Sequence, residues 1–165
     1  MIKVTYENTM PYEYNLFRRG AHYCLPSGSY RNHGEMCEHI AKFWRGIFTD
    51  VNPSTTYDTG SDIETERASV KSSNSSLAHF ILEGEYTTND FIKTYFANVH
   101  STKFIWVEWD ENTEMVTEYQ MNKREFGAFV QKFGRPAYSS DTHALKVRFL
   151  PSSKKMVRWL EERVA

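Results

Sequence analysis

Residues 60–72 read GSDIETERASVKS, and this stretch decides how the rest of the chain is interpreted. It places Asp62 seven positions before Ser69 and Lys71 two positions after Ser69. If the stretch folds back on itself as a tight hairpin, Asp62 lies beside the other two, which share one strand face because strand side chains alternate. An acid and a lysine that lie close together suit Mg²⁺-dependent hydrolysis of a phosphodiester. The acid binds the metal, and the lysine orients the attacking water or stabilises the negative charge on the phosphate.

The elements around this stretch follow from capping and apolar spacing. Strands are expected over residues 54–64 and 67–72, with a turn at Thr65-Glu66. A helix is expected over residues 33–47, because Asn32 is a good N-cap and Glu35 follows at capping-box spacing. Its apolar stripe consists of Met36, Ile40, Phe43, Trp44 and Ile47. Residues 1–31 predict one short strand near the start, followed by irregular chain.

Downstream, helical and strand patterns alternate. Residues 77–82 are an apolar run that periodicity assigns to neither class. The further expected elements are a helix after Thr87 or Thr88 with Tyr95, Phe96 and Val99 inward, a strand over 104–109, a turn over 110–113, a strand over 115–121, a helix from Asn122 to Gly134, a strand over 145–149 and a last helix opened by Pro151. This order predicts a mixed α/β fold in one domain spanning residues 1–165.

Composition limits the class of protein. A chain of 165 residues suits one domain with one core. It has no run of about 18 apolar residues, so no membrane span is expected. The first residues carry an early acid and lack an apolar signal core. Two cysteines are too few for a disulfide scaffold, so we expect a reduced, cytoplasmic setting.

The distribution of charge is more informative than the net charge of −1. Residues 1–50 hold six basic and five acidic residues, residues 51–121 hold four and twelve, and residues 122–165 hold ten and four. An acidic middle suits metal binding, and a basic C-terminal third suits contact with a polyanion. Ordinary solvated charge would explain the basic end equally well.

Residues 33–72 as a whole resemble the PD-(D/E)xK nuclease superfamily, which has the restriction-endonuclease-like fold. The resemblance is carried by Gly34-Glu35 on a helix that stops at Gly46, by Gly60-Ser61-Asp62-Ile63, and by Ser69-Val70-Lys71. It implies helices flanking a central mixed sheet, and an endonuclease that cleaves DNA with Mg²⁺ or Mn²⁺. A single compact domain of this type often works as a homodimer on duplex DNA.

The chain departs from the family pattern at one position. Ser69 stands where the family usually has Glu or Asp, two residues before the lysine. Members with a serine there recruit a glutamate from elsewhere in the fold. On this resemblance Asp62 would hold the metal, Lys71 would activate the water, and Ser69 would give a hydrogen bond or a water-mediated metal contact.

Three glutamates are candidates for the substitute acid. Glu35 is the first choice, because a helical wheel places it at the flank of the apolar stripe and places Glu38 nearly opposite, toward solvent. Glu64 shares the expected strand face of Asp62 and is a second candidate metal ligand. Glu85 follows Lys71 by fourteen positions. Glu35 also has a purely structural interpretation as a capping residue, and Glu64 and Glu85 as exposed acids.

Candidate nucleic-acid contacts lie in two groups. Arg67 and the hydroxyls of Ser72 and Ser73 flank the proposed catalytic residues, where short side chains and backbone amides bind phosphate oxygens. The second group lies on the last helix and consists of Lys154, Lys155 and Arg158. Arg31 and Lys42 are further candidates. A flexible polar loop and a solvated helix face are the structural alternatives.

Two other functions compete with cleavage of DNA. The near-neutral net charge and the serine at position 69 favour a nuclease-like fold that only binds nucleic acid or a protein partner. A zinc-stabilised interaction domain would use the four residues His22, Cys24, His33 and Cys37. A Cys–His hydrolase built on either cysteine is a weaker alternative.

Overall fold

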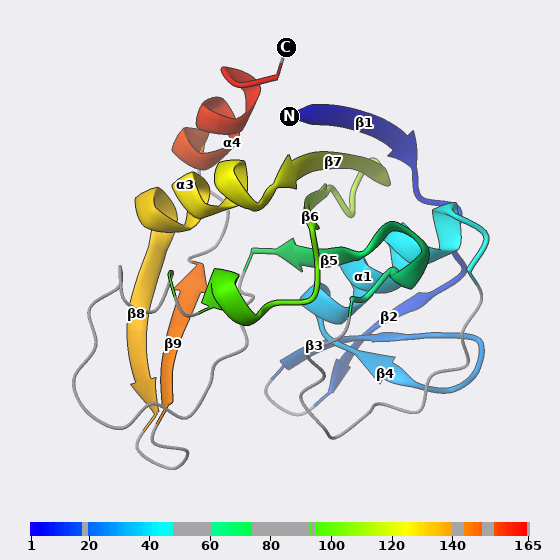
Figure 1. Ribbon diagram of the computed structural model, residues 1–165. Coiled ribbons are helices and arrows are strands. Elements are labelled where there is room, and N and C mark those ends of the chain that lie inside the picture. Colours follow the sequence, from blue (N-terminus) through cyan, green and yellow to red (C-terminus); the bar gives the residue numbers. More distant parts are fainter. Residues whose placement is uncertain are drawn as a thin grey trace.

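The computed structural model describes residues 1–17, 20–47, 61–73, 93, 95–139, 144–149 and 154–164 (Figure 1). A four-stranded mixed sheet lies at its centre. The strand order is β1 (Ile2–Glu7), β7 (Met115–Asn122), β6 (Lys103–Trp109) and β5 (Ala68–Ser72). β5 and β6 are parallel, and the other two pairs are antiparallel. The expected mixed α/β class is confirmed, and β6, β7 and β5 lie where the sequence predicted strands.

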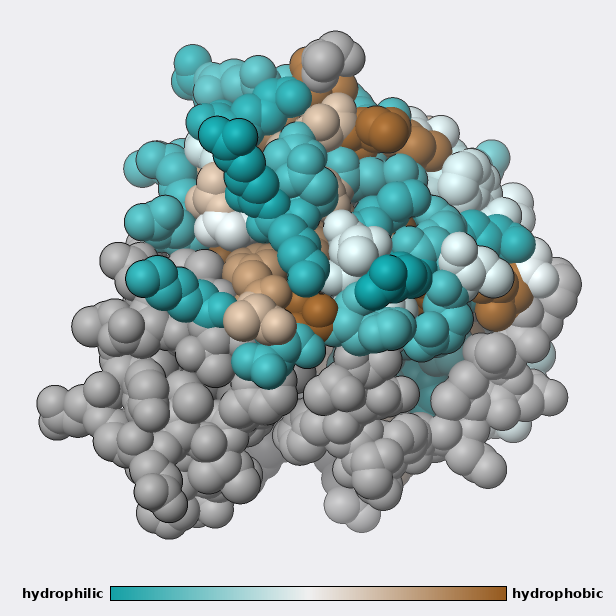
Figure 2. Space-filling view, in the orientation of Figure 1, coloured by the Kyte–Doolittle hydropathy of each residue, from teal (hydrophilic) through white to brown (hydrophobic). Residues whose placement is uncertain are grey.

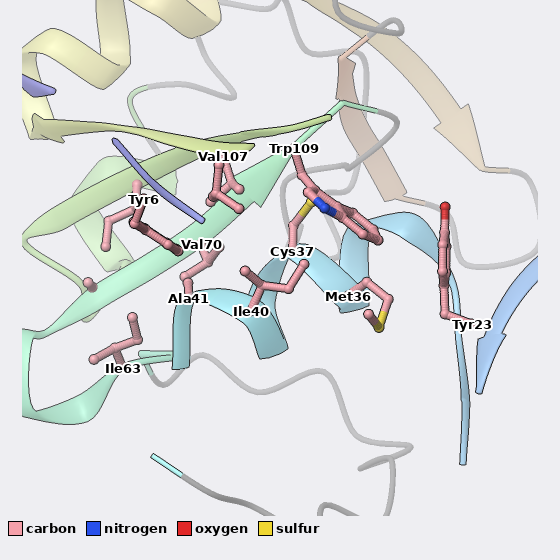
Figure 3. Packing of buried hydrophobic residues seen from close by; sticks show 13 residues of the cluster. Tyr6, Tyr23, Met36, Cys37, Ile40, Ala41, Ile63, Val70, Val107 and Trp109 are labelled. Atoms are coloured by element: carbon pink, nitrogen blue, oxygen red, sulfur yellow. The ribbon is translucent and has the colours of Figure 1, made fainter. Parts of the chain in front are cut away.

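Helices cover both faces of this sheet. α1 (His33–Trp44) shares an apolar cluster with Ile105 and Val107 of β6 (Figure 3). α3 (Lys123–Phe133) and α4 (Lys154–Glu161) belong to a second cluster, which contains Phe104 and Trp106. Because neighbouring residues of a strand point to opposite faces, β6 alone contributes to both clusters. α1 and α4 therefore lie on opposite faces of the sheet.

Both predicted N-caps form, but of these two helices only α3 has a full capping box, because the Glu35 carboxylate lies beside Arg31 and not on the Asn32 N–H. Asn122 and Glu125 make the full capping box of α3, and Gly134 is its C-cap. Asn32 accepts a 2.9 Å hydrogen bond from the backbone N–H of Glu35 at the start of α1. α1 ends at Trp44, three residues earlier than expected, and Gly46 follows with φ of 75°. Such a left-handed conformation favours glycine.

The N-terminal third is more regular than the sequence predicted. β2 (Glu13–Phe17), β3 (Gly20–Cys24) and β4 (Tyr30–Arg31) form a three-stranded antiparallel sheet where irregular chain was expected. A hairpin of β8 (Gly134–Ser139) and β9 (Ala144–Phe149) follows α3. β9 matches the predicted strand, whereas β8 was missed because Gly134 was interpreted only as a helix end.

Several expected elements fall partly outside the described residues. These are residues 54–60 of the strand expected over 54–64, the apolar run 77–82, the start of the helix after Thr87 or Thr88, and Pro151. The described end of the first of these is not a strand: Ile63 forms an isolated bridge and Glu64 begins a 3₁₀ turn. Residues 95–98 are helical, and Tyr95, Phe96 and Val99 belong to the second cluster, as predicted. The last helix is observed over α4, with Met156 and Leu160 buried.

A buried ion pair fixes the end of α1 to the sheet. Arg45, the C-cap of α1, contacts Glu118 of β7 in a bidentate arrangement, with Nη1–Oε2 and Nη2–Oε1 distances of 2.9 and 2.6 Å. Glu118 is completely buried and also accepts a 2.6 Å hydrogen bond from the Tyr6 hydroxyl. These contacts set where the last turn of α1 lies over β5.

Hydrophilic residues cover most of the described surface on the side of the molecule shown in Figure 2. Among the described residues, every helix is too short or too polar to cross a membrane.

Candidate active site

A tight turn brings Asp62 next to β5. Ile63 and Ala68 exchange two backbone hydrogen bonds, of 3.0 and 3.1 Å, across an isolated antiparallel bridge. Between them lie a 3₁₀ turn at Glu64–Glu66 and Arg67, whose φ of 49° is left-handed. The turn places residue 62 opposite residues 69 and 70, which is the proximity that the sequence predicted.

The Asp62 carboxylate is held by the start of β5. Its Oδ2 atom accepts a 2.7 Å hydrogen bond from the backbone N–H of Val70 and a 3.3 Å hydrogen bond from the Ser69 hydroxyl. Ser69 is 6 % exposed. Ser69 therefore orients the carboxylate. Both hydrogen bonds use Oδ2, and among the described residues none is donated to Oδ1.

The pKa shift of Asp62 identifies the charged residues that lie near its carboxyl group. Burial raises the pKa of its carboxyl group, and the charge of Glu38 raises this pKa further. The cations Lys71 and Lys42 and the Val70 N–H act in the opposite direction and lower it. Two carboxylates and two ammonium groups, all on half-buried residues, thus lie close enough for the other three to influence Asp62.

Glu38, and not Glu35, is the acid of α1 whose charge raises the pKa of Asp62. The Glu35 side chain is 46 % exposed, and its carboxylate lies 3.7 Å from the Arg31 guanidinium. Glu38 is 31 % exposed and pairs with Lys42 at 2.8 Å. The prediction that Glu38 points to solvent is wrong, since Glu38 is half-buried and pairs with a lysine that is only 12 % exposed.

The physical reason is the true position of the apolar stripe of α1. Its buried residues are Met36, Cys37, Ile40 and Ala41, whereas Trp44 is 47 % exposed. The predicted stripe left out Cys37 and Ala41. Including these two turns the buried face toward Glu38 and away from Glu35.

Glu64 does not share a strand face with Asp62. It belongs to the 3₁₀ turn, its side chain is exposed, and its Oε1 atom accepts a 3.0 Å hydrogen bond from the backbone N–H of Ser61. Its carboxylate therefore closes the turn. Glu85 lies outside the described residues.

The candidate nucleic-acid contacts are scattered. Arg67 is exposed beside the turn and donates a 2.9 Å hydrogen bond to the carbonyl of His100. Ser72 is 1 % exposed, and its hydroxyl contacts the Cys37 thiol, so it faces α1 and not the surface. Ser73 is half-buried.

The basic residues of α4 lie on the far side of the sheet from α1. Lys154 and Lys155 are exposed, and Arg158 pairs with Glu162 at 3.1 Å. The structure therefore does not bring these three residues together with Asp62 and Lys71.

The zinc alternative lacks a ligand cluster. His33 Nε2 lies 3.6 Å from the Cys37 sulfur, but His22 packs against Phe17, and the Cys24 thiol contacts the carbonyl of Leu25. Both cysteines are free. Burial raises the pKa of the Cys37 thiol to about 12, which also disfavours a Cys–His nucleophile at this position.

The carboxylates of Asp62 and Glu38 offer oxygen ligands, the donor type that a hard divalent cation prefers. Across the described ranges, no three His, Cys, Asp or Glu side chains gather closely enough to hold a metal ion. Asp62 and Glu38 are a pair with oxygen ligands only. Mg²⁺ is commonly bound by one or two carboxylates, with water and substrate phosphate completing its octahedron.

Two neighbours of Asp62 were not recognised from the sequence as part of the site. Glu38 was assigned to solvent, and Tyr95 was assigned only to the core. Tyr95 is buried, and burial together with the Asp62 charge raises the pKa of its hydroxyl. For Glu38, the available signal in the sequence was its i, i+4 spacing from Lys42.

Comparison with known proteins adds no assignment: no protein-family model, curated protein or solved structure matches the chain.

Proposed function

We propose that the protein is a metal-dependent deoxyribonuclease with a restriction-endonuclease-like fold. The observation that carries the proposal is the electrostatic coupling of Asp62 to Glu38, Lys71 and Lys42 in one half-buried group, in which Lys42 and Glu38 pair at 2.8 Å. Two acids and a lysine from a helix, a turn and an adjacent strand are the chemical set that hydrolysis of a phosphodiester requires.

Each residue has a role that its geometry supports. Asp62 and Glu38 would hold Mg²⁺ or Mn²⁺, which, when bound, polarises the scissile phosphate and lowers the pKa of a bound water. Ser69 and the Val70 N–H fix one oxygen of Asp62, so the carboxylate is oriented before a substrate arrives. Lys71 would hold the attacking water or the negative charge that develops on the phosphate.

Cleavage of supercoiled plasmid and of single-stranded DNA with Mg²⁺ or Mn²⁺ tests the proposal. Wild type should cut, and Asp62→Ala and Lys71→Ala should not. Lys132→Ala is the matched control, because Lys132 is exposed on α3, on the other face of the sheet from α1. Equal cutting by wild type and Asp62→Ala would refute the assignment.

A second candidate is a nuclease-like domain that binds DNA without cutting it. It is favoured by Ser69, which stands in the place of the second acid of the family pattern and whose hydroxyl donates a hydrogen bond to Asp62. This candidate predicts a gel shift by wild type with intact DNA after prolonged incubation with Mn²⁺. The resemblance also implies a homodimer on duplex DNA, which light scattering with and without an oligonucleotide would test.

A further inference from the structure

Lys42 is a half-buried residue in the last turn of α1, and its side chain is well sheltered from solvent. Its side chain is only 12 % exposed, and its Nζ atom donates a 2.8 Å hydrogen bond to Glu38 Oε1. The i, i+4 pair of Arg158 and Glu162 is 83 % and 57 % exposed. A lysine amine that is this sheltered needs a compensating negative charge nearby.

The charge of Lys42 reaches beyond its hydrogen-bonded partner. It lowers the pKa of Asp62, so it acts on both carboxylates of the site. Lys71 also lowers this pKa, so two cations balance the two anions. The group is therefore close to neutral as it stands, and a divalent cation would enter a site that already contains its own counter-charge.

We propose that Lys42 is a built-in competitor of the divalent metal ion, occupying Glu38 until the ion displaces its amine. This inference rests on the proposed function, because it assumes that Glu38 and Asp62 are the metal ligands. On this proposal Lys42 lowers the affinity of the site for a metal ion, because the ion binds Glu38 only after the Lys42 ammonium has left the Glu38 oxygen.

The alternative is that the Lys42–Glu38 pair only supports α1. Surface i, i+4 pairs stabilise helices in this way. A purely supporting Lys42 acts on a metal ion only through its charge, so the gain in affinity from Lys42→Met should persist when Glu38 is replaced by Gln. The competitor predicts that this gain disappears in the Glu38→Gln background, which makes metal affinity in the two backgrounds the decisive measurement.

The test is the affinity for Mn²⁺ alone, measured from free Mn²⁺ by electron paramagnetic resonance, for wild type, Lys42→Met and Lys42→Arg, and for Glu38→Gln with and without Lys42→Met. Lys42→Met should bind Mn²⁺ about tenfold more tightly than wild type, at the low end of the 10–100-fold changes that outer groups make to metal affinity. Lys42→Arg keeps the charge and should bind more weakly than Lys42→Met. Lys132→Met is the control, since it makes the same change of net charge on the other face of the sheet and should match wild type.

The outcomes separate this inference from the proposed function. An equal or lower affinity in Lys42→Met, or a gain that persists in the Glu38→Gln background, with a helical circular dichroism spectrum like that of wild type, overturns the inference and leaves the nuclease proposal standing. If Lys42→Met fails to fold, Lys42→Gln is measured in its place, with the same expected sign. Tight Mn²⁺ binding that survives Asp62→Asn refutes the proposed metal ligands, and with them both proposals.

Discussion

Oδ2 of Asp62 accepts a 2.7 Å hydrogen bond from the backbone N–H of Val70, the residue between Ser69 and Lys71. A backbone donor cannot rotate away as a side chain can, so the position of the carboxylate is fixed by the start of β5 itself. The Asp62 carboxylate and Lys71 are therefore positioned by the same short strand. The acid on α1, Glu38, was identified only from the structure.

Glu38→Gln should abolish DNA cleavage to the level of Asp62→Ala, whereas Glu35→Gln should retain it. The reason is position, because Glu38 acts on Asp62 and Glu35 lies beside Arg31 in an exposed setting. The two variants make the same chemical change three residues apart on one helix. Plasmid cleavage with Mn²⁺ measures both, and a loss of activity in Glu35→Gln alone would reverse the assignment of the helix acid.

Asp62→Asn should stabilise the protein at neutral pH. The pKa of the carboxyl group is raised in the folded state, so the charged form is disfavoured there, and the wild type loses stability as the pH rises through the folded-state pKa. An asparagine keeps an acceptor for the Val70 N–H without the charge. The expected gain is about 1 kcal/mol, or roughly 2–4 °C in Tm for a chain of this size.

The pH dependence of this gain is its check. Thermal melts at pH 8 should show a higher Tm for Asp62→Asn than for wild type. Melts at a pH below the ordinary aspartate pKa should show equal Tm values, since Asp62 of the wild type is then also protonated. Asp110→Asn, in an exposed turn, makes the same change away from the site and should have little effect at either pH. A gain that persists unchanged at low pH would mean that the charge of Asp62 is not its cause.

His39 should remain neutral to unusually low pH. Burial, together with the positive charges of Arg31 and Lys42, lowers its pKa from 6.5 to about 4. The unfolded chain then binds a proton that the folded chain does not, so the stability contributed by this group is lost as the pH falls from 6.5 toward 4. Titration of the ring protons by NMR measures the pKa directly.

Arg31 supplies the variant for this measurement. Its Nε donates a 3.1 Å hydrogen bond to His39 Nε2, so Arg31→Gln removes both a donor and a charge. The pKa of His39 should rise in this variant. A pKa near that of a free histidine in the wild-type protein would contradict the described environment.

Arg45→Met should cost about 3–5 kcal/mol of unfolding free energy, because it leaves the fully buried Glu118 without its bidentate partner. Urea denaturation with linear extrapolation measures the loss. Arg158→Met breaks the exposed pair with Glu162 and should change stability by less than about 1 kcal/mol. Similar losses in the two variants would show that the Arg45 pair is not buried in solution.

Local signals predicted much of this fold. Asn122 and Glu125 are a complete helix-start signal within four residues, and they form the capping box that the spacing predicts. The turn that pairs Ile63 with Ala68 was likewise expected from short-range sequence. The three-stranded sheet of β2, β3 and β4 was not, because its strands are short and their pattern of exposure hardly alternates.

The candidate site was predictable only in part, for a different reason. Asp62, Ser69 and Lys71 are close in sequence, so a local argument places them together. The helix acid depends on how α1 is rotated about its axis, and that rotation is set by the packing of small residues such as Cys37 and Ala41. A helical wheel weighted toward large side chains therefore selected Glu35 in place of Glu38.

The apolar packing between α1 and β5 decides whether the charged group exists at all. Glu38 and Lys42 come from the helix, Asp62 and Lys71 come from the turn and the strand, and one cluster that includes Ile40 and Val70 joins the two parts. A chain in which the helix has not yet docked carries all four residues but no assembled site. We therefore expect temperature-sensitive variants, active when cool and inactive when warm, to come from substitutions in this apolar interface and not from substitutions of the charged residues.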